Sequence, residues 1–233
     1  MKTELIVALD VSSMEAVRET VRALGDTADY YKVGLELFTG QGPSVLEALR
    51  REGKRVFLDL KLHDIPRTVA RAVAAAGQQG ATMLTVHAGG GSAMLTAAAD
   101  AARACGPAGP KVVAVTVLTS LDETDLRKVG VARPVGEHVQ ALADQAIGAG
   151  VDGLVCSPLE LAALRERLGA TPILVAPGVR PADADVGDQK RVATPAAAVR
   201  AGATYVVVGR PILEAADPAA AARQIRAELA AAE

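Results

Sequence analysis

Short aliphatic runs alternate along the chain with longer, alanine-rich stretches of helical composition. The runs are almost continuously apolar, which is typical of parallel strands that are covered on both faces. They predict strands over residues 5–10, 31–38, 55–62, 83–88, 111–118, 153–157, 173–176 and 204–209. The stretches between and after them predict helices over residues 13–24, 42–52, 66–79, 92–104, 136–149, 158–168, 194–201 and 218–232.

Residues that favour helix ends stand at the borders of these stretches. Ser12 or Ser13, Ser92 and Thr194 occupy positions at which a side chain can cap a helix N-terminus, and glycine follows several helices. Strands that are each followed by a helix, in a chain of 233 residues, predict an α/β fold, a (β/α)8 TIM barrel that forms a single domain over residues 1–233. An open doubly wound sheet stays the alternative, because alternation alone does not show closure.

The composition argues against nucleic acid and membranes as partners. Aromatic residues make up only 2% of the chain and the formal net charge is −2, whereas nucleic-acid modules stack bases on rings and neutralise phosphates. The longest apolar runs, such as 112–118, have the length of a strand and not of a membrane span. The first four residues lead directly into a predicted strand, so we expect no signal peptide.

Cys105 and Cys156 match neither a disulfide framework nor the spacing of a metal site. We therefore expect two reduced cysteines and a cytoplasmic location.

Charged side chains occupy one predicted strand in an unusual way. Because side chains alternate along a strand, Asp59 and Lys61 share one face of the segment 55–62, while three leucines share the other. With the leucines packed against helices, Asp59 and Lys61 point into the barrel, at the strand ends where such barrels carry catalytic groups. Since an unpaired buried charge is costly, we expect them to pair with each other or with Lys32. A purely architectural ion pair is the alternative.

The end of the last predicted strand suits a phosphate. Gly209 and Arg210 offer backbone N–H groups and a guanidinium, and barrels often hold phosphate after their last two strands. The loop over residues 180–190 is long and rich in Asp, Gly and Pro, which predicts a lid or a binding loop. His87 precedes three glycines and is compatible with a supporting role near the site or with a tight turn. His63 lies where the predicted strand meets the loop and is compatible with packing, with a supporting hydrogen bond or with catalysis.

The segment Asp-Leu-Lys-Leu-His-Asp-Ile-Pro, residues 59–66, resembles the signature Asp-x-Lys-x-x-Asp-Ile of the orotidine 5′-phosphate decarboxylase family. The resemblance continues in the same order along the chain, around Asp10, Lys32, Thr119, 177–180, 187–195 and 208–210. Two positions depart from the pattern: Gly187 stands where an acidic residue is common, and Val117 where a polar residue is common.

The resemblance implies decarboxylation of orotidine 5′-monophosphate to UMP and carbon dioxide, the last step of pyrimidine nucleotide synthesis, without a metal or another cofactor. It implies that Lys61 donates the proton and that Asp59 and Asp64 hold its ammonium. The residues that it assigns to substrate binding are Asp10, Lys32, Ile65, Thr68, Thr119, Arg180, Gln189, Gly209 and Arg210. It also implies a homodimer in which Asp64, Ile65 and Thr68 reach the neighbouring active site.

The chemistry agrees with these assignments. Loss of carbon dioxide from a carbon without an adjacent electron sink leaves a localised carbanion, so the enzyme must supply on the order of 20 kcal/mol of transition-state stabilisation. An ammonium group can stabilise that charge and then donate the proton. Two other functions stay open: a metal-dependent lyase or aldolase that acts on a sugar phosphate, and a barrel that only binds a phosphorylated ligand.

Overall fold

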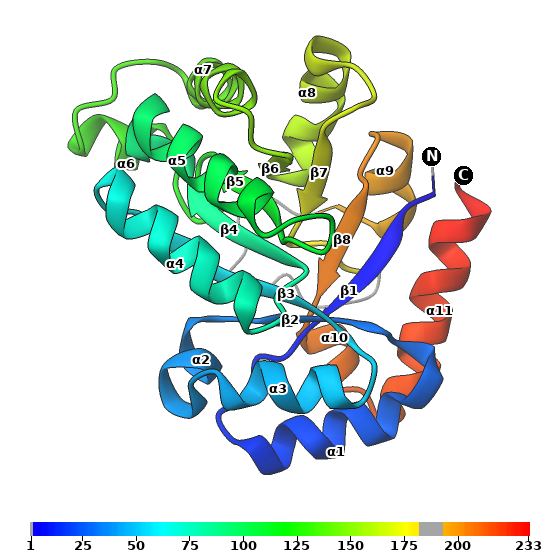
Figure 1. Ribbon diagram of the computed structural model, residues 1–233. Helices are drawn as coiled ribbons and strands as arrows, with labels where there is room; N and C mark the ends of the chain where they lie inside the picture. Colours follow the sequence, from blue (N-terminus) through cyan, green and yellow to red (C-terminus); the bar gives the residue numbers. More distant parts are fainter. Residues whose placement is uncertain (1, 182–192) are drawn as a thin grey trace.

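The strands of the chain close into one barrel (Figure 1), seen in a computed structural model that describes residues 2–181 and 193–233. Each strand pairs in parallel with the next one, and the last pairs with the first. The strands are β1 (Glu4–Ala8), β2 (Tyr30–Val33), β3 (Arg55–Leu62), β4 (Met83–His87), β5 (Lys111–Val115), β6 (Gly153–Val155), β7 (Ile173–Ala176) and β8 (Tyr205–Val208). The TIM barrel is therefore confirmed, and the open sheet is wrong.

Helices surround the barrel on its outside (Figure 1). They are α1 (Met14–Leu24), α2 (Leu35–Gln41), α3 (Ser44–Arg51), α4 (Pro66–Gln78), α5 (Gly91–Ala104), α6 (Glu123–Lys128), α7 (Val135–Gly148), α8 (Leu161–Leu168), α9 (Pro195–Arg200), α10 (Arg210–Leu213) and α11 (Pro218–Ala231). Short 3₁₀ turns are η1 (Gly25–Thr27), η2 (Ala88–Gly90) and η3 (Pro158–Glu160). Among the residues described, no helix combines the length and the apolar character that a membrane crossing requires.

Two of the three predicted caps are confirmed. Ser13 accepts a hydrogen bond from a backbone N–H in the first turn of α1, and Thr194 does so for α9. The prediction for Ser92 is wrong, because α5 begins one residue earlier and Gly90 takes the capping position.

The predicted second strand is wrong beyond Val33, where β2 ends and α2 soon begins. A short apolar run is ambiguous, since periodicity alone does not separate a buried strand from a buried helix segment. Gly34 marks the change, and a Cβ at this position would lie only 3.0 Å from Lys32 Nζ. The early end of β2 thus places Lys32 at the mouth of the barrel with room around its ammonium.

Other boundaries differ by fewer residues. β5 and β6 end before the predicted limits of 118 and 157, so the polar residues that follow lie in loops. α6 and α10 were not predicted, because helices of 6 and 4 residues are too short to show a periodic pattern.

Apolar side chains form two cores, one on each face of the barrel wall. The outer core lies between strands and helices and includes Leu58, with Leu60 and Leu62 packed against it. The inner core fills the barrel with Ile6, Ala8, Tyr30, Phe57, Met83, Val113, Val175 and Val207. Both faces of the strands are covered, as the continuous apolar runs predict.

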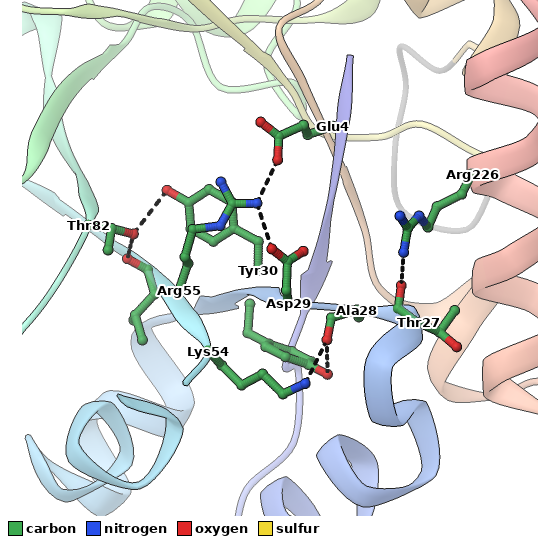
Figure 2. A network of polar contacts seen from close by, with 11 residues as sticks. Glu4, Thr27, Ala28, Asp29, Tyr30, Lys54, Arg55, Thr82 and Arg226 are labelled. Carbon is green, nitrogen blue, oxygen red and sulfur yellow. Dashed lines mark hydrogen bonds and ion pairs between the residues drawn. The ribbon is translucent and has the colours of Figure 1, made fainter. Parts of the chain in front are cut away.

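Arg55 ties together the N-terminal ends of the strands (Figure 2). Its guanidinium lies 4.3 Å from the centre of the Tyr30 ring and donates hydrogen bonds to Glu4 at 2.5 Å and Asp29 at 3.0 Å. Tyr30 in turn meets Tyr205 edge-on, with ring centres 5.6 Å apart. This network joins β1, β2, β3 and β8 at the end of the barrel where the strands begin.

Candidate active site

A cavity of about 550 Å³ opens at the carboxyl ends of the strands. Phe57, Ala8 and Val207 of the inner core form part of its lining, so the cavity continues directly from the packed barrel interior. The cavity brings together most of the predicted site residues: Asp10, Lys32, Asp59, Lys61, Thr119, Arg180, Gly209 and Arg210. Sequence reasoning missed Pro211 and Glu214, which line it beyond Arg210 in the short helix α10 and at its end.

Four charged side chains of alternating sign form a row in this cavity. Lys32 Nζ lies 3.1 Å from Asp10 Oδ1 and 4.0 Å from Asp59 Oδ2. Lys61 Nζ lies 3.0 Å from each carboxylate oxygen of Asp59. The side chains of Lys32 and Asp59 are only 14% and 15% exposed, so each needs its partner to offset the loss of water. The predicted pairing of Asp59 with Lys61 and Lys32 inside the barrel is confirmed.

Lys61 lies in a bulge at the end of β3. The strands β3 and β4 pair at Leu58 and again only at Leu62. Residues 59–61 of β3 therefore lie opposite a single residue of β4, Thr85. Lys61 has a φ of 51°, and it is the one non-glycine residue with a positive φ in the described part of the chain. A left-handed backbone costs a non-glycine residue about 1–2 kcal/mol, so the surrounding contacts must compensate for it.

Thr85, which is fully buried, is not among the site residues that the sequence predicts. Its hydroxyl accepts a hydrogen bond from the backbone N–H of Lys61 at 2.8 Å and donates one to Asp59 Oδ1 at 3.0 Å. The sequence does contain a signal for Thr85. Side chains two residues apart share one face of a strand, so Thr85 points to the same side of β4 as Met83, which belongs to the inner core. A hydroxyl at that position needs a partner inside the barrel.

Another part of the cavity wall is suited to an anion. Arg180 and Arg210 both line the cavity, and Arg180 Nε is buried without a hydrogen-bond partner among the described residues. Gly209 lies so close to β1 that a Cβ would come within 2.9 Å of Asp10 Oδ2 and 3.3 Å of Ala8 Cβ. Any larger residue at position 209 would displace the carboxylate of Asp10.

Three predicted residues lie outside the cavity. Asp64, Ile65 and Thr68 are exposed around the start of α4, and 67% of Ile65 is exposed. Asp64 Oδ1 accepts a hydrogen bond from the N–H of Ile65 at 2.7 Å, and in this single subunit it forms no ion pair with Lys61. Gln189 lies outside the described residues, as does most of the predicted binding loop over 180–190.

Two histidines stack beside Lys61. The rings of His63 and His87 are 5.2 Å apart with an interplanar angle of 12°, and His87 Nδ1 accepts a hydrogen bond from the N–H of Gly89 at 3.1 Å. His87 thereby caps the turn η2, which agrees with one of its two predicted roles. Burial, followed by the neighbouring His63 and Lys61, holds the pKa of His87 below its ordinary value.

The cavity presents the Lys61 ammonium in a fixed direction. It offers lysine ammonium groups at the ends of β2 and β3 and guanidinium groups after β7 and β8, and apolar side chains also line it. It can hold a molecule that carries a phosphate at one end and develops negative charge at the other. Within residues 2–181 and 193–233 no group of three or more His, Cys, Asp or Glu is arranged to hold a metal ion.

The lowered pKa of His87 predicts a pH dependence of stability. Its neutral form stabilises the fold fully above the ordinary pKa of 6.5, and this contribution is lost as the pH falls through the lower pKa of the folded state. His87→Asn keeps an acceptor for Gly89 and removes the titration. We expect its free energy of unfolding to decrease less than that of the unmodified protein between about pH 7.5 and about pH 5, measured by denaturant titration.

The control is His63→Asn, which retains His87 and most of the pH dependence. An equal decrease in His87→Asn and the unmodified protein would contradict the assignment.

Comparison with known proteins gives matches over nearly the whole chain. A family model described as "Orotidine 5'-phosphate decarboxylase / HUMPS family" matches residues 3–225. Orotidine 5'-phosphate decarboxylase of Anaeromyxobacter sp. strain K is 54% identical over 225 residues, which are 97% of either chain. The Moorella thermoacetica protein of the same name is 52% identical over 233 residues, or 98% of this chain and 92% of that one. The crystal structure of orotidine 5'-phosphate decarboxylase from Lactobacillus acidophilus superimposes with a TM-score of 0.88 at 42% identity, covering 98% of this chain and 99% of that chain.

Proposed function

The chain belongs to the orotidine 5′-phosphate decarboxylase / HUMPS family, and we infer that it converts orotidine 5′-monophosphate to UMP and carbon dioxide. It is a carboxy-lyase of pyrimidine nucleotide synthesis, as its relatives' names indicate and as the resemblance of residues 59–66 predicts. The observation that carries this function within the site is the ammonium of Lys61, which is held by Asp59 at the mouth of the barrel.

Lys61 is the proposed proton donor. When the bond to the carboxylate breaks, its electron pair stays on the ring carbon, and carbon dioxide leaves. A nearby ammonium stabilises the developing negative charge and then transfers a proton to that carbon, after which the lysine regains a proton from solvent. Asp59 accepts hydrogen bonds from Lys61 through both carboxylate oxygens, and this fixes the direction of the ammonium before the reaction begins.

The remaining cavity residues are proposed to bind the rest of the substrate. Gly209, Arg210 and Arg180 suit the phosphate, because guanidinium groups bind phosphate oxygens in pairs. Asp10 and Lys32 suit the ribose hydroxyls, and Thr119 the polar edge of the pyrimidine. Gln189 stays a prediction for the phosphate.

The lining between these groups includes Val117, Val155 and Cys156 and, apart from Phe57 in the floor, no aromatic side chain among the described residues. The pyrimidine is therefore proposed to lie against aliphatic walls and to be oriented by hydrogen bonds.

A homodimer with shared active sites is proposed as well. Ile65 is large, apolar and 67% exposed, and its neighbour Asp64 is exposed as well, which is an arrangement typical of a surface that another subunit covers. In a symmetric dimer, Asp64 of the partner subunit would place a second carboxylate against Lys61. Ile65 and Thr68 would close the cavity from the same side. The cytoplasmic location stays a prediction.

Lys61→Ala should lower kcat for orotidine 5′-monophosphate by more than about a thousandfold while the protein still binds UMP, because it removes both charge stabilisation and proton transfer. The decrease of the orotidine absorbance band measures turnover, and calorimetry measures UMP binding. The matched control is Lys111→Ala at the start of β5, whose exposed side chain pairs with Asp152 far from the cavity, and which should retain full activity.

Near-normal turnover by Lys61→Ala would contradict the proton-donor role. The same assay on the unmodified protein with EDTA distinguishes the metal-dependent alternative, since we expect no loss. Activity that disappears with EDTA and returns with magnesium would favour the sugar-phosphate lyase chemistry.

Mixing two inactive variants tests the shared site. Lys61→Ala and Asp64→Ala are each expected to be inactive, but a heterodimer of the two contains one site with both residues intact. Random reassociation makes half of the dimers heterodimers, so the mixture should recover roughly a quarter of the unmodified activity per subunit. The two variants are unfolded and refolded together so that their subunits exchange. The control is Lys61→Ala alone, unfolded and refolded in the same way. No recovery in a mixture that refolds to dimers would contradict a site shared through Asp64.

A further inference from the structure

The strained backbone of Lys61 needs a contact that maintains it. Lysine gains nothing from a left-handed conformation, which glycine and asparagine adopt most easily, yet this residue has a φ of 51°. At the bulge, β3 and β4 are out of register between Leu58 and Leu62, so regular pairing is interrupted there. The N–H of Lys61 instead donates to Thr85 Oγ1 at 2.8 Å. A side-chain hydroxyl thus takes the place of a backbone acceptor.

The same hydroxyl also holds the partner of the Lys61 ammonium. A threonine hydroxyl has one proton, and since Oγ1 accepts from Lys61, that proton is available to Asp59 Oδ1 at 3.0 Å. Asp59 then accepts from Lys61 Nζ at 3.0 Å. The contacts form a closed ring that runs from the backbone of Lys61 through Thr85 and Asp59 back to the side chain of Lys61.

The position of Thr85 separates it from the substrate. Thr85 is fully buried and is not part of the cavity lining, so it acts only through its two neighbours. Its β-branched side chain has few rotamers, which fixes the direction of the hydroxyl. Burial also means that water does not readily replace the hydroxyl when it is lost.

We propose that Thr85 is a positioning residue for the decarboxylation: its hydroxyl fixes the left-handed backbone of Lys61 and the carboxylate of Asp59 together, and so aims the ammonium at the reacting carbon. This inference rests on the proposed function and deepens it. We expect the effect in the chemical step, because the hydrogen bonds of Thr85 join it to Lys61 and Asp59, the groups that are proposed to deliver and to hold the proton-donating ammonium.

The test compares Thr85→Val with Thr85→Ser, because valine keeps the shape and loses the hydroxyl, whereas serine keeps the hydroxyl. We expect Thr85→Val to lower kcat by about 10- to 100-fold, with KM and UMP affinity changed less than about threefold. Thr85→Ser should restore most of kcat. The matched control is Thr116→Val: Thr116 is as buried and donates to the carbonyl of Val155, but it has no contact with Lys61 or Asp59.

Several results would overturn the proposal. They are an unchanged kcat in Thr85→Val, a loss of kcat that serine does not restore, and a loss of kcat equal to that of Thr116→Val.

If Thr85→Val does not fold, Thr85→Cys is compared with Thr85→Ser, since a thiol is similar in size to a hydroxyl but forms only weak hydrogen bonds. A kcat of Thr85→Cys equal to that of Thr85→Ser would then refute the role. An unmodified protein without decarboxylase activity would refute the proposed function and this inference with it, whereas an active unmodified protein together with an unchanged kcat in Thr85→Val would refute this inference alone.

Discussion

The ion pair between Lys61 and Asp59 is the interaction on which the site depends. Two opposite charges at the mouth of an apolar barrel are stable only because each compensates the other for lost water. Lys32 and Asp10 extend the pair into a row of alternating charges, and Thr85 connects it to β4. An ammonium that is fixed in this way before substrate arrives needs little reorganisation during the reaction, which is the main source of electrostatic catalysis.

The barrel separates the contacts that stabilise it from those that do chemistry. At the N-terminal ends of the strands, Arg55 joins Glu4, Asp29 and the ring of Tyr30 (Figure 2). At the carboxyl ends, the bulge at Lys61 is strained and the charges face a cavity. The inner core lies between these ends, so the strain at the site is compensated by packing elsewhere in the same strands.

Sequence reasoning identified β3 correctly because its apolar run is long and its alternation places Asp59 and Lys61 inside. The same reasoning extended β2 too far, because a helix that begins with Leu35 shows the same short apolar run as a strand. Thr85 was missed for a different reason: its partners come from another strand, and the bulge that creates its hydrogen bonds is a property of the packed barrel. Asp64 illustrates a third case, since it is exposed in the single chain and its proposed contact with Lys61 depends on the proposed dimer.

A crystal structure of the protein with UMP tests directly whether Lys61 faces the reacting carbon. We expect Lys61 Nζ to lie about 3–3.5 Å from the ring carbon that receives the proton. We also expect Asp59 still to accept hydrogen bonds from Lys61, and the phosphate to contact Gly209 and Arg210. A ring bound away from Lys61, or a Lys61 side chain turned toward the phosphate, would contradict the role of Lys61 as proton donor.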